Sequence, residues 1–112
     1  MVYTTIAFFA LAAILGSILL SYILRSKETP KGMALLHGLL AATGLVLLLY
    51  YVFNNKPGPE ESAVLFTIAA LGGFIVFFRD ITNKPVPKWL AVVHGLVAVT
   101  GFIFLLIFAF AK

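Results

Sequence analysis

The chain has 112 residues, of which 62% are hydrophobic and 11% charged, and these proportions exclude the surface of a soluble globular domain. Its formal net charge is +4, but the basic residues lie between and beside apolar segments, so the charge does not indicate nucleic-acid binding. The chain has no cysteine, which excludes disulfides and thiolate metal sites.

Four segments are apolar over enough residues to cross a bilayer. In chain order they are residues 3–24, 33–53, 62–78 and 89–110. A spanning helix needs about 20 mostly apolar residues, so the third segment is the shortest that qualifies. The first segment has no basic region before it and no evident small-residue cleavage site, so we interpret it as a retained helix. We predict one all-α domain over residues 1–112, an integral membrane up-and-down four-helix bundle whose partner is the lipid bilayer.

The basic residues predict how this bundle is oriented. The connections between the first and second segments and between the third and fourth contain Arg25, Lys27, Lys31, Arg79, Lys84 and Lys88. The opposite side has only Lys56 and the terminal Lys112. Because basic loops stay on the cytoplasmic side of a membrane, we expect both termini outside and both basic loops in the cytoplasm, in an inner or plasma membrane.

The second half of the chain repeats the first. Residues 30–53 align without a gap with residues 87–110, and twelve of the 24 positions are identical. His37 falls on His94, so equivalent positions are 94 − 37 = 57 residues apart, and this spacing is the repeat offset. We therefore predict two tandem helical hairpins, 3–53 and 60–110. Since each repeat has two helices, both enter the membrane in the same direction, so the repeat is parallel, about an axis along the membrane normal.

Small residues recur along the first and third segments. They are Ala7, Ala10, Ala13 and Gly16 in the first, and Thr67, Ala70 and Gly73 at equivalent positions of the third. Such stripes let helix backbones approach closely in lipid. We interpret them as packing surfaces inside the bundle, and they would equally serve a homodimer.

The two histidines are the candidate functional residues. An ionisable side chain inside a span is by default a functional hypothesis and turns toward the bundle interior. His37 lies about 9 Å deeper than Lys31 along its helix, and the parallel repeat puts His94 at the same depth. Small residues lie on the same helix face or next in sequence: Gly38, Ala41, Gly44, Gly95, Ala98 and Gly101. We predict two imidazoles that face each other across the two-fold axis, with space cleared beside them.

A b-type haem fits this pattern, because its flat macrocycle is held by one imidazole from each of two helices. The predicted iron ligands are His37 and His94, and the six small residues named above would make room for the ring. Lys31 and Lys88, at the cytoplasmic end, would pair with the propionates. The absence of cysteine excludes the covalently attached c-type haem.

With these residues the chain resembles the four-helix bis-histidine membrane cytochromes, of which the cytochrome b561 group is an example. The resemblance covers the number of helices, the matched histidines and the nearby glycines. It implies an electron carrier whose partner is a quinone or another redox protein. Members of that group that carry electrons across the membrane use two histidine pairs and two haems. This chain has one pair, which implies a single haem near the cytoplasmic side.

Several alternatives remain open at the level of sequence. Each histidine would also be explained by a hydrogen bond to a backbone carbonyl or to Thr67 that holds the hairpins in register. A cofactor-free interaction or transport protein would use the pair for packing or proton sensing. A bare transition metal is disfavoured, because no carboxylate or thiol lies in the spans to complete its ligand shell. No hydrolase motif is present, so we expect a carrier or binding protein and not a catalyst.

Overall fold

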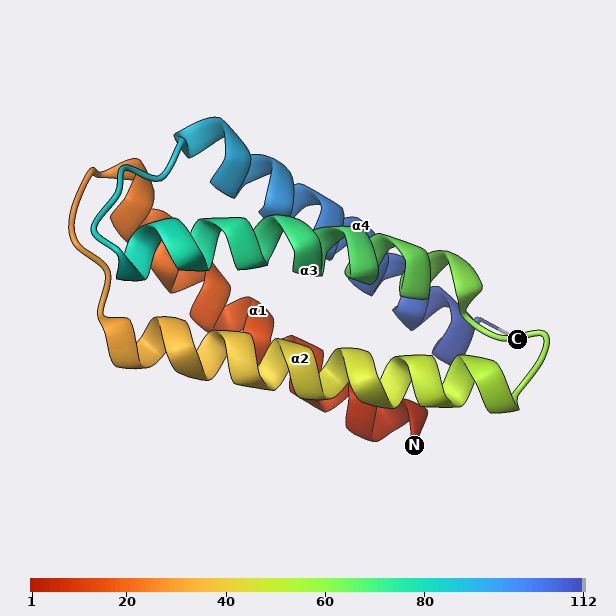
Figure 1. Ribbon diagram of the computed structural model, residues 1–112. Coiled ribbons are helices and arrows are strands. Elements are labelled where there is room, and N and C mark those ends of the chain that lie inside the picture. Colours follow the sequence, from red (N-terminus) through yellow and green to blue (C-terminus); the bar gives the residue numbers. More distant parts are fainter. Residues whose placement is uncertain (112) are drawn as a thin grey trace.

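The structure, a computed structural model, describes residues 1–111 and is built from helices alone. They are α1 (Val2–Leu24), α2 (Lys31–Asn54), α3 (Glu60–Ile81) and α4 (Lys88–Phe110). Consecutive helices run in opposite directions along one elongated bundle (Figure 1), which measures 43 × 21 × 19 Å. Each of the four is long and apolar enough to cross a membrane. The prediction of an all-α, four-helix chain is confirmed.

The third helix is longer than its hydropathy suggests. The predicted apolar segment covers residues 62–78, whereas α3 extends from Glu60 to Ile81. Most of the added residues are charged, but Glu60 and Glu61 lie in the first turn and Arg79 in the last. Acidic residues at the N-terminus and basic residues at the C-terminus complement the helix dipole. A hydropathy window stops at these charges although the helix continues through them.

The ends of α1 and α3 have the same backbone geometry. Ser26 and Asn83, which are related by the repeat offset, adopt the left-handed conformation with φ of 56° and 60°. The backbone N–H of Lys27 then donates to the Tyr22 carbonyl at 2.9 Å, and the equivalent N–H of Lys84 donates to the Arg79 carbonyl at 2.8 Å. These bonds satisfy helix-terminal carbonyls and form a Schellman motif, which reverses the chain toward the next helix.

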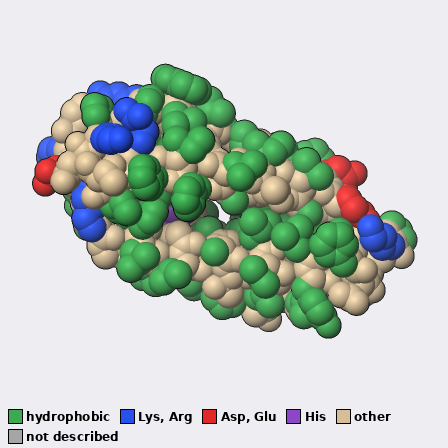
Figure 2. All heavy atoms as spheres, viewed as in Figure 1, with side chains coloured by type: hydrophobic (Ala, Val, Ile, Leu, Met, Phe, Trp, Pro, Cys, Tyr) green, Lys and Arg blue, Asp and Glu red, His purple; other side chains and the backbone are tan. Residues whose placement is uncertain are grey.

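The bundle consists of two hairpins, α1–α2 and α3–α4, that pack more closely within themselves than against each other. The small apolar core between them centres on Phe9, Leu48, Phe66 and Leu105, and the two leucines are fully buried. Large apolar side chains are instead exposed along most of the outside (Figure 2). Such continuous apolar surface is typical of helices that meet lipid and not water.

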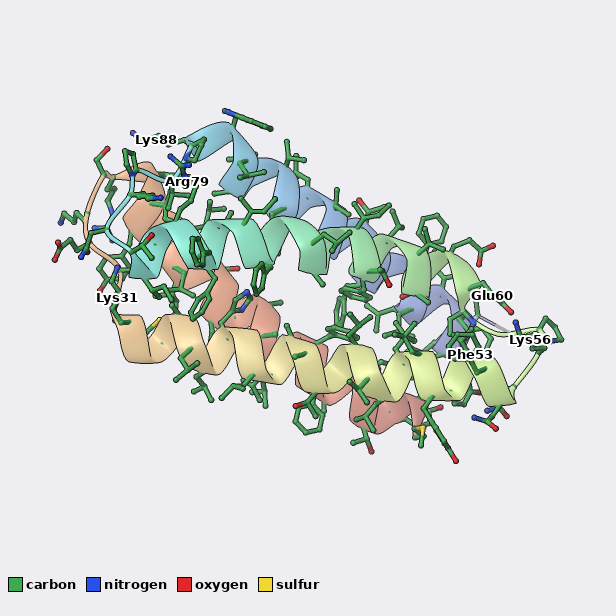
Figure 3. All side chains as sticks on the ribbon, viewed as in Figure 1. Lys31, Phe53, Lys56, Glu60, Arg79 and Lys88 are labelled. Atoms are coloured by element: carbon green, nitrogen blue, oxygen red, sulfur yellow. The ribbon has the colours of Figure 1, made fainter. Side chains whose placement is uncertain are left out.

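Charged side chains gather at the two ends of the bundle (Figure 2). Lys31, Arg79 and Lys88 lie at one end, and Lys56 and Glu60 lie at the other (Figure 3). At the first end Lys31 Nζ is 3.0 Å from Asp80 Oδ1, and the hydroxyl of Thr29 donates to the other carboxylate oxygen. This network ties the loop before α2 to the end of α3. Lys112, counted above on the opposite side, lies outside the described residues.

Candidate functional site

The structure brings His37 of α2 and His94 of α4 together in the bundle interior. Their ring centroids are 6.3 Å apart and the ring planes are nearly perpendicular, at 89°. The helices α2 and α4 occupy opposite corners of the bundle, since each packs against α1 and α3. The two imidazoles therefore reach across the space between the hairpins, and each ring comes from a different hairpin.

One nitrogen of each imidazole is fixed by the neighbouring helix. His37 Nδ1 lies 2.7 Å from the carbonyl oxygen of Ala12, and His94 Nδ1 lies 2.7 Å from that of Ala69. A carbonyl can only accept, so Nδ1 is the protonated nitrogen and donates in both rings. In the neutral imidazole the other nitrogen, Nε2, is then the unprotonated one. Both bonds lie within a hairpin, from α2 to α1 and from α4 to α3.

Two glycines make these hydrogen bonds accessible. Gly16 is four residues after Ala12, and Gly73 is four residues after Ala69, so each follows by one helical turn the carbonyl that accepts the histidine proton. A Cβ added at Gly16 would lie 2.8 Å from His37 Cε1, and one at Gly73 would lie 2.7 Å from His94 Cε1. Without a side chain in that position, the imidazole rests directly on the helix backbone and reaches the second lone pair of the carbonyl.

The Nε2 atoms remain free for another partner. Among residues 1–111 neither Nε2 makes a hydrogen bond. Every fully buried side-chain nitrogen or oxygen in this range has a hydrogen-bond partner, so the two unpaired Nε2 atoms are not fully buried. Figure 2 shows a hollow between α2 and α3 with a histidine side chain visible at its edge. An unprotonated, accessible imidazole nitrogen is a metal ligand or a hydrogen-bond acceptor.

Not all of the predicted small residues surround this pair. A Cβ added at Gly38 or Gly95 would meet no atom within 4 Å, and Gly38 is exposed. Each directly follows a histidine, and one residue turns about 100° around a helix with 3.6 residues per turn. An alanine methyl group at either position would therefore touch neither imidazole, and the expectation that the two glycines make room for a haem stays a prediction.

The other small residues lie along the interior face of α2 and α4. Gly44 and Gly101 are buried, and they accommodate the rings of Phe9 and Phe66, which would lie 3.2 Å and 3.4 Å from an added Cβ. The space at these glycines is filled by phenylalanine from the same hairpin. Ala41 and Ala98, between histidine and glycine, are half-buried.

The two predicted lysines lie at the basic end of the bundle (Figure 3). Lys31 Nζ already has Asp80 and Thr29 as partners, at 3.0 and 3.1 Å. Lys88 is the first residue of α4 and is exposed. Of the two, Lys88 is the one whose ammonium is available to an added anion without breaking an ion pair.

The donor set suits a metal that brings most of its own ligands. No three His, Cys, Asp or Glu side chains cluster within residues 1–111, so side chains of these four types supply two nitrogens here and no third ligand. A metal bonded at about 2 Å to one nitrogen of each imidazole holds the ring centroids at most roughly 6 Å apart. The observed 6.3 Å is compatible with that arrangement.

The sequence predicts the two histidines as site residues but not their hydrogen-bond acceptors. Ala12 and Ala69 contribute only backbone oxygen, and Gly16 and Gly73 were interpreted as a packing stripe. The signal for them was the repeat itself, because both acceptor and glycine recur at the repeat offset. No family model, curated protein or solved structure matches this chain.

Proposed function

We propose that this protein is a small b-type haem protein of the membrane, with one haem held between α2 and α4 by His37 and His94, and that it carries electrons. One observation supports this above the others. Each imidazole is held through Nδ1 by a carbonyl, while its Nε2 is accessible beside a second, identically held imidazole 6.3 Å away. A ligating histidine is usually oriented by such a bond from its other nitrogen.

The membrane location rests on size and surface. The bundle is 43 Å long, and a bilayer with its headgroup regions is about 40–45 Å thick. Its sides are apolar and its charges lie at the ends. With the basic loops in the cytoplasm of an inner or plasma membrane, the N-terminus and the α2–α3 connection face outside.

The paired site is proposed to arise from two tandem hairpins, 3–53 and 60–110, related by a parallel repeat. The contacts that support this recur at the repeat offset. The bond from His37 to Ala12 recurs as that from His94 to Ala69, and the packing of Phe9 on Gly44 recurs with Phe66 on Gly101. Equivalent contacts from the two halves thus meet at the same level of the bundle.

In this role the residues of the chain would bind the haem iron, orient the two imidazoles and shield the site on its outer side. His37 and His94 would hold the iron through Nε2, and the carbonyls that accept from Nδ1 would increase the electron density that each Nε2 offers to it. The stacked Phe9 and Phe66, about one helical turn nearer the outer end than Ala12 and Ala69, close the interior on that side. A bound haem would supply one-electron exchange at its iron. A quinone or a redox protein would then approach from the basic end, where Lys88 is free to pair with an anion.

A second candidate function follows from the same hydrogen bonds. Each joins two helices of one hairpin, so the histidines would also serve as structural ties in a cofactor-free interaction or transport protein. Thr67, the other partner considered, instead donates to the carbonyl of Ala63 in its own helix. This candidate assigns no role to the free Nε2 atoms except proton uptake.

Absorption spectra distinguish the two candidates. We would purify the protein in detergent, add haem, and record oxidised and dithionite-reduced spectra of the wild type, His37→Ala and His94→Ala. We expect a low-spin haem spectrum that sharpens on reduction in the wild type and is lost or becomes high-spin in either variant. A protein that stays colourless after haem addition, while all three forms remain helical by circular dichroism, would overturn the haem proposal and favour the structural ties.

A further inference from the structure

A cavity of about 280 Å³ lies on the outside of α3, away from the histidine pair and close to the basic end. It is lined by Phe74, Ile75, Phe78, Arg79 and Lys84. The three apolar side chains are between 50% and 69% exposed, so this face of α3 is directed outward and not into the bundle. The cavity therefore combines apolar walls along a membrane-length helix with two cations at the helix end.

The two cations have no anionic partner in the described part of the chain. Arg79 Nε donates to the Pro85 carbonyl at 2.7 Å, which holds the guanidinium beside the cavity and leaves its terminal nitrogens without a bond within residues 1–111. Lys84 is exposed. The adjacent acid, Asp80, is engaged by Lys31 and Thr29. Asp80 thus belongs to the only ion pair among residues 1–111 and does not neutralise Arg79 or Lys84.

The first hairpin does not have the same features. At the repeat offset, Phe74 and Phe78 correspond to Ser17 and Ser21, and Arg79 corresponds to Tyr22. Lys84 corresponds to Lys27, but Lys27 is followed by an acid, Glu28, where Lys84 is followed by proline. Although the backbone at the two helix ends is equivalent, the two phenylalanines and the arginine of this cavity have no equivalent in the first hairpin.

We infer that this cavity binds an anionic phospholipid, with the headgroup phosphate on Arg79 and Lys84 and the start of an acyl chain along Phe74, Ile75 and Phe78. A guanidinium offers two parallel N–H donors to phosphate oxygens, and the ammonium adds a point charge. Basic pockets at the cytoplasmic ends of membrane helices recognise anionic headgroups in this way. Charge complementarity selects phospholipids with net negative charge over zwitterionic ones.

Native mass spectrometry of the detergent-purified protein tests the inference, with phosphatidylglycerol and phosphatidylcholine as probes. We expect one phosphatidylglycerol retained in preference to phosphatidylcholine. Arg79→Gln and Lys84→Gln should each weaken its binding about fivefold, the effect of one cation near an anionic surface. Replacing the apolar walls by the residues of the first hairpin, with Phe74→Ser and Phe78→Ser, should also weaken binding. These side chains are exposed, and circular dichroism verifies that the variants stay helical.

Lys27→Gln is the matched control, because Lys27 occupies the same backbone position in the other hairpin and its replacement makes the same change in net charge. We expect it to leave binding unchanged. Equal weakening by Lys27→Gln would overturn the inference in favour of a diffuse surface charge. Equal retention of the two lipids would overturn it as well, as would displacement of phosphatidylglycerol by millimolar inorganic phosphate, which would indicate a site for small anions.

Discussion

Phe9 and Phe66 stack face to face where the two hairpins meet, with ring centroids 3.8 Å apart and planes within 1° of parallel. Phe9 lies against Gly44 of α2 and Phe66 against Gly101 of α4, so each ring packs on the other helix of its own hairpin. Because contacts between the hairpins are fewer than within them, this pair is a main apolar contact that joins the two halves.

A double-mutant cycle on Phe9→Leu and Phe66→Leu measures that contact. We expect a coupling free energy near the lower end of about 0.5–1.5 kcal/mol, because a face-to-face stack is less favourable than an offset or edge-to-face pair. Stability would be measured as the free energy of unfolding in detergent. Effects that add to within about 0.3 kcal/mol would mean that the two rings do not interact.

Substitution of the glycines under the imidazoles should disturb the histidine pair. Gly16→Ala and Gly73→Ala place a methyl group 2.8 and 2.7 Å from a ring carbon, so something must shift there, and we expect the ring's carbonyl bond to weaken. We expect a cost of about 1–3 kcal/mol in unfolding free energy, typical of overpacking, together with reduced haem retention.

Gly38→Ala and Gly95→Ala are the matched controls for these substitutions. They occur on the histidine-bearing helices, but the added Cβ meets nothing within 4 Å. We expect unchanged haem absorbance and unchanged or increased stability, since alanine is favoured over glycine in a helix by about 1 kcal/mol. Loss of haem in these controls would mean that the two glycines do border the site.

Ser62 should contribute to the packing of the second hairpin. Its fully buried hydroxyl donates to the Gly101 carbonyl of α4 at 2.9 Å, whereas the equivalent Thr5 donates to Met1 at the start of its own helix. We expect Ser62→Ala to lower the unfolding free energy by about 0.6 kcal/mol, the average for such bonds in a membrane protein. Thr67→Ala, which removes only a bond within α3, should cost less in the same assay.

The ion pair between Lys31 and Asp80 should have a small, salt-dependent effect. Lys31 is 42% exposed, and pairs with that much solvent contact contribute about 0.2–1 kcal/mol. A double-mutant cycle with Lys31→Gln and Asp80→Asn, repeated in high salt, should show a coupling that declines as ionic strength rises. A coupling that salt leaves unchanged would indicate that the pair is shielded from solvent.

The helices were predictable from the sequence, because apolar runs of this length have few alternatives once a bilayer is the solvent. The end of α3 at Ile81 was not, since Arg79 lies inside the helix but outside its apolar run. The pairing of His37 with His94 was also predictable, because alignment of the two repeats compares side chains one by one.

Other features of the site depend on tertiary geometry that a sequence does not encode directly. Gly38 was assigned by its closeness to His37 along the chain, although helical rotation carries it to the outside. The backbone oxygens of Ala12 and Ala69 are of a kind present at every residue, so nothing in the residue types distinguishes these two acceptors. They become specific only when the hairpin packs its helices at one register.

The bonds from His37 to Ala12 and from His94 to Ala69 each lie within one hairpin, so neither depends on a contact with the other hairpin. Each hairpin carries one oriented imidazole, and the pair forms when the two hairpins associate. The connection between them, residues 55–59, contributes no atom to these bonds. Two separately expressed polypeptides cut at this connection should therefore reassemble into the same arrangement, as subunits of a dimer would.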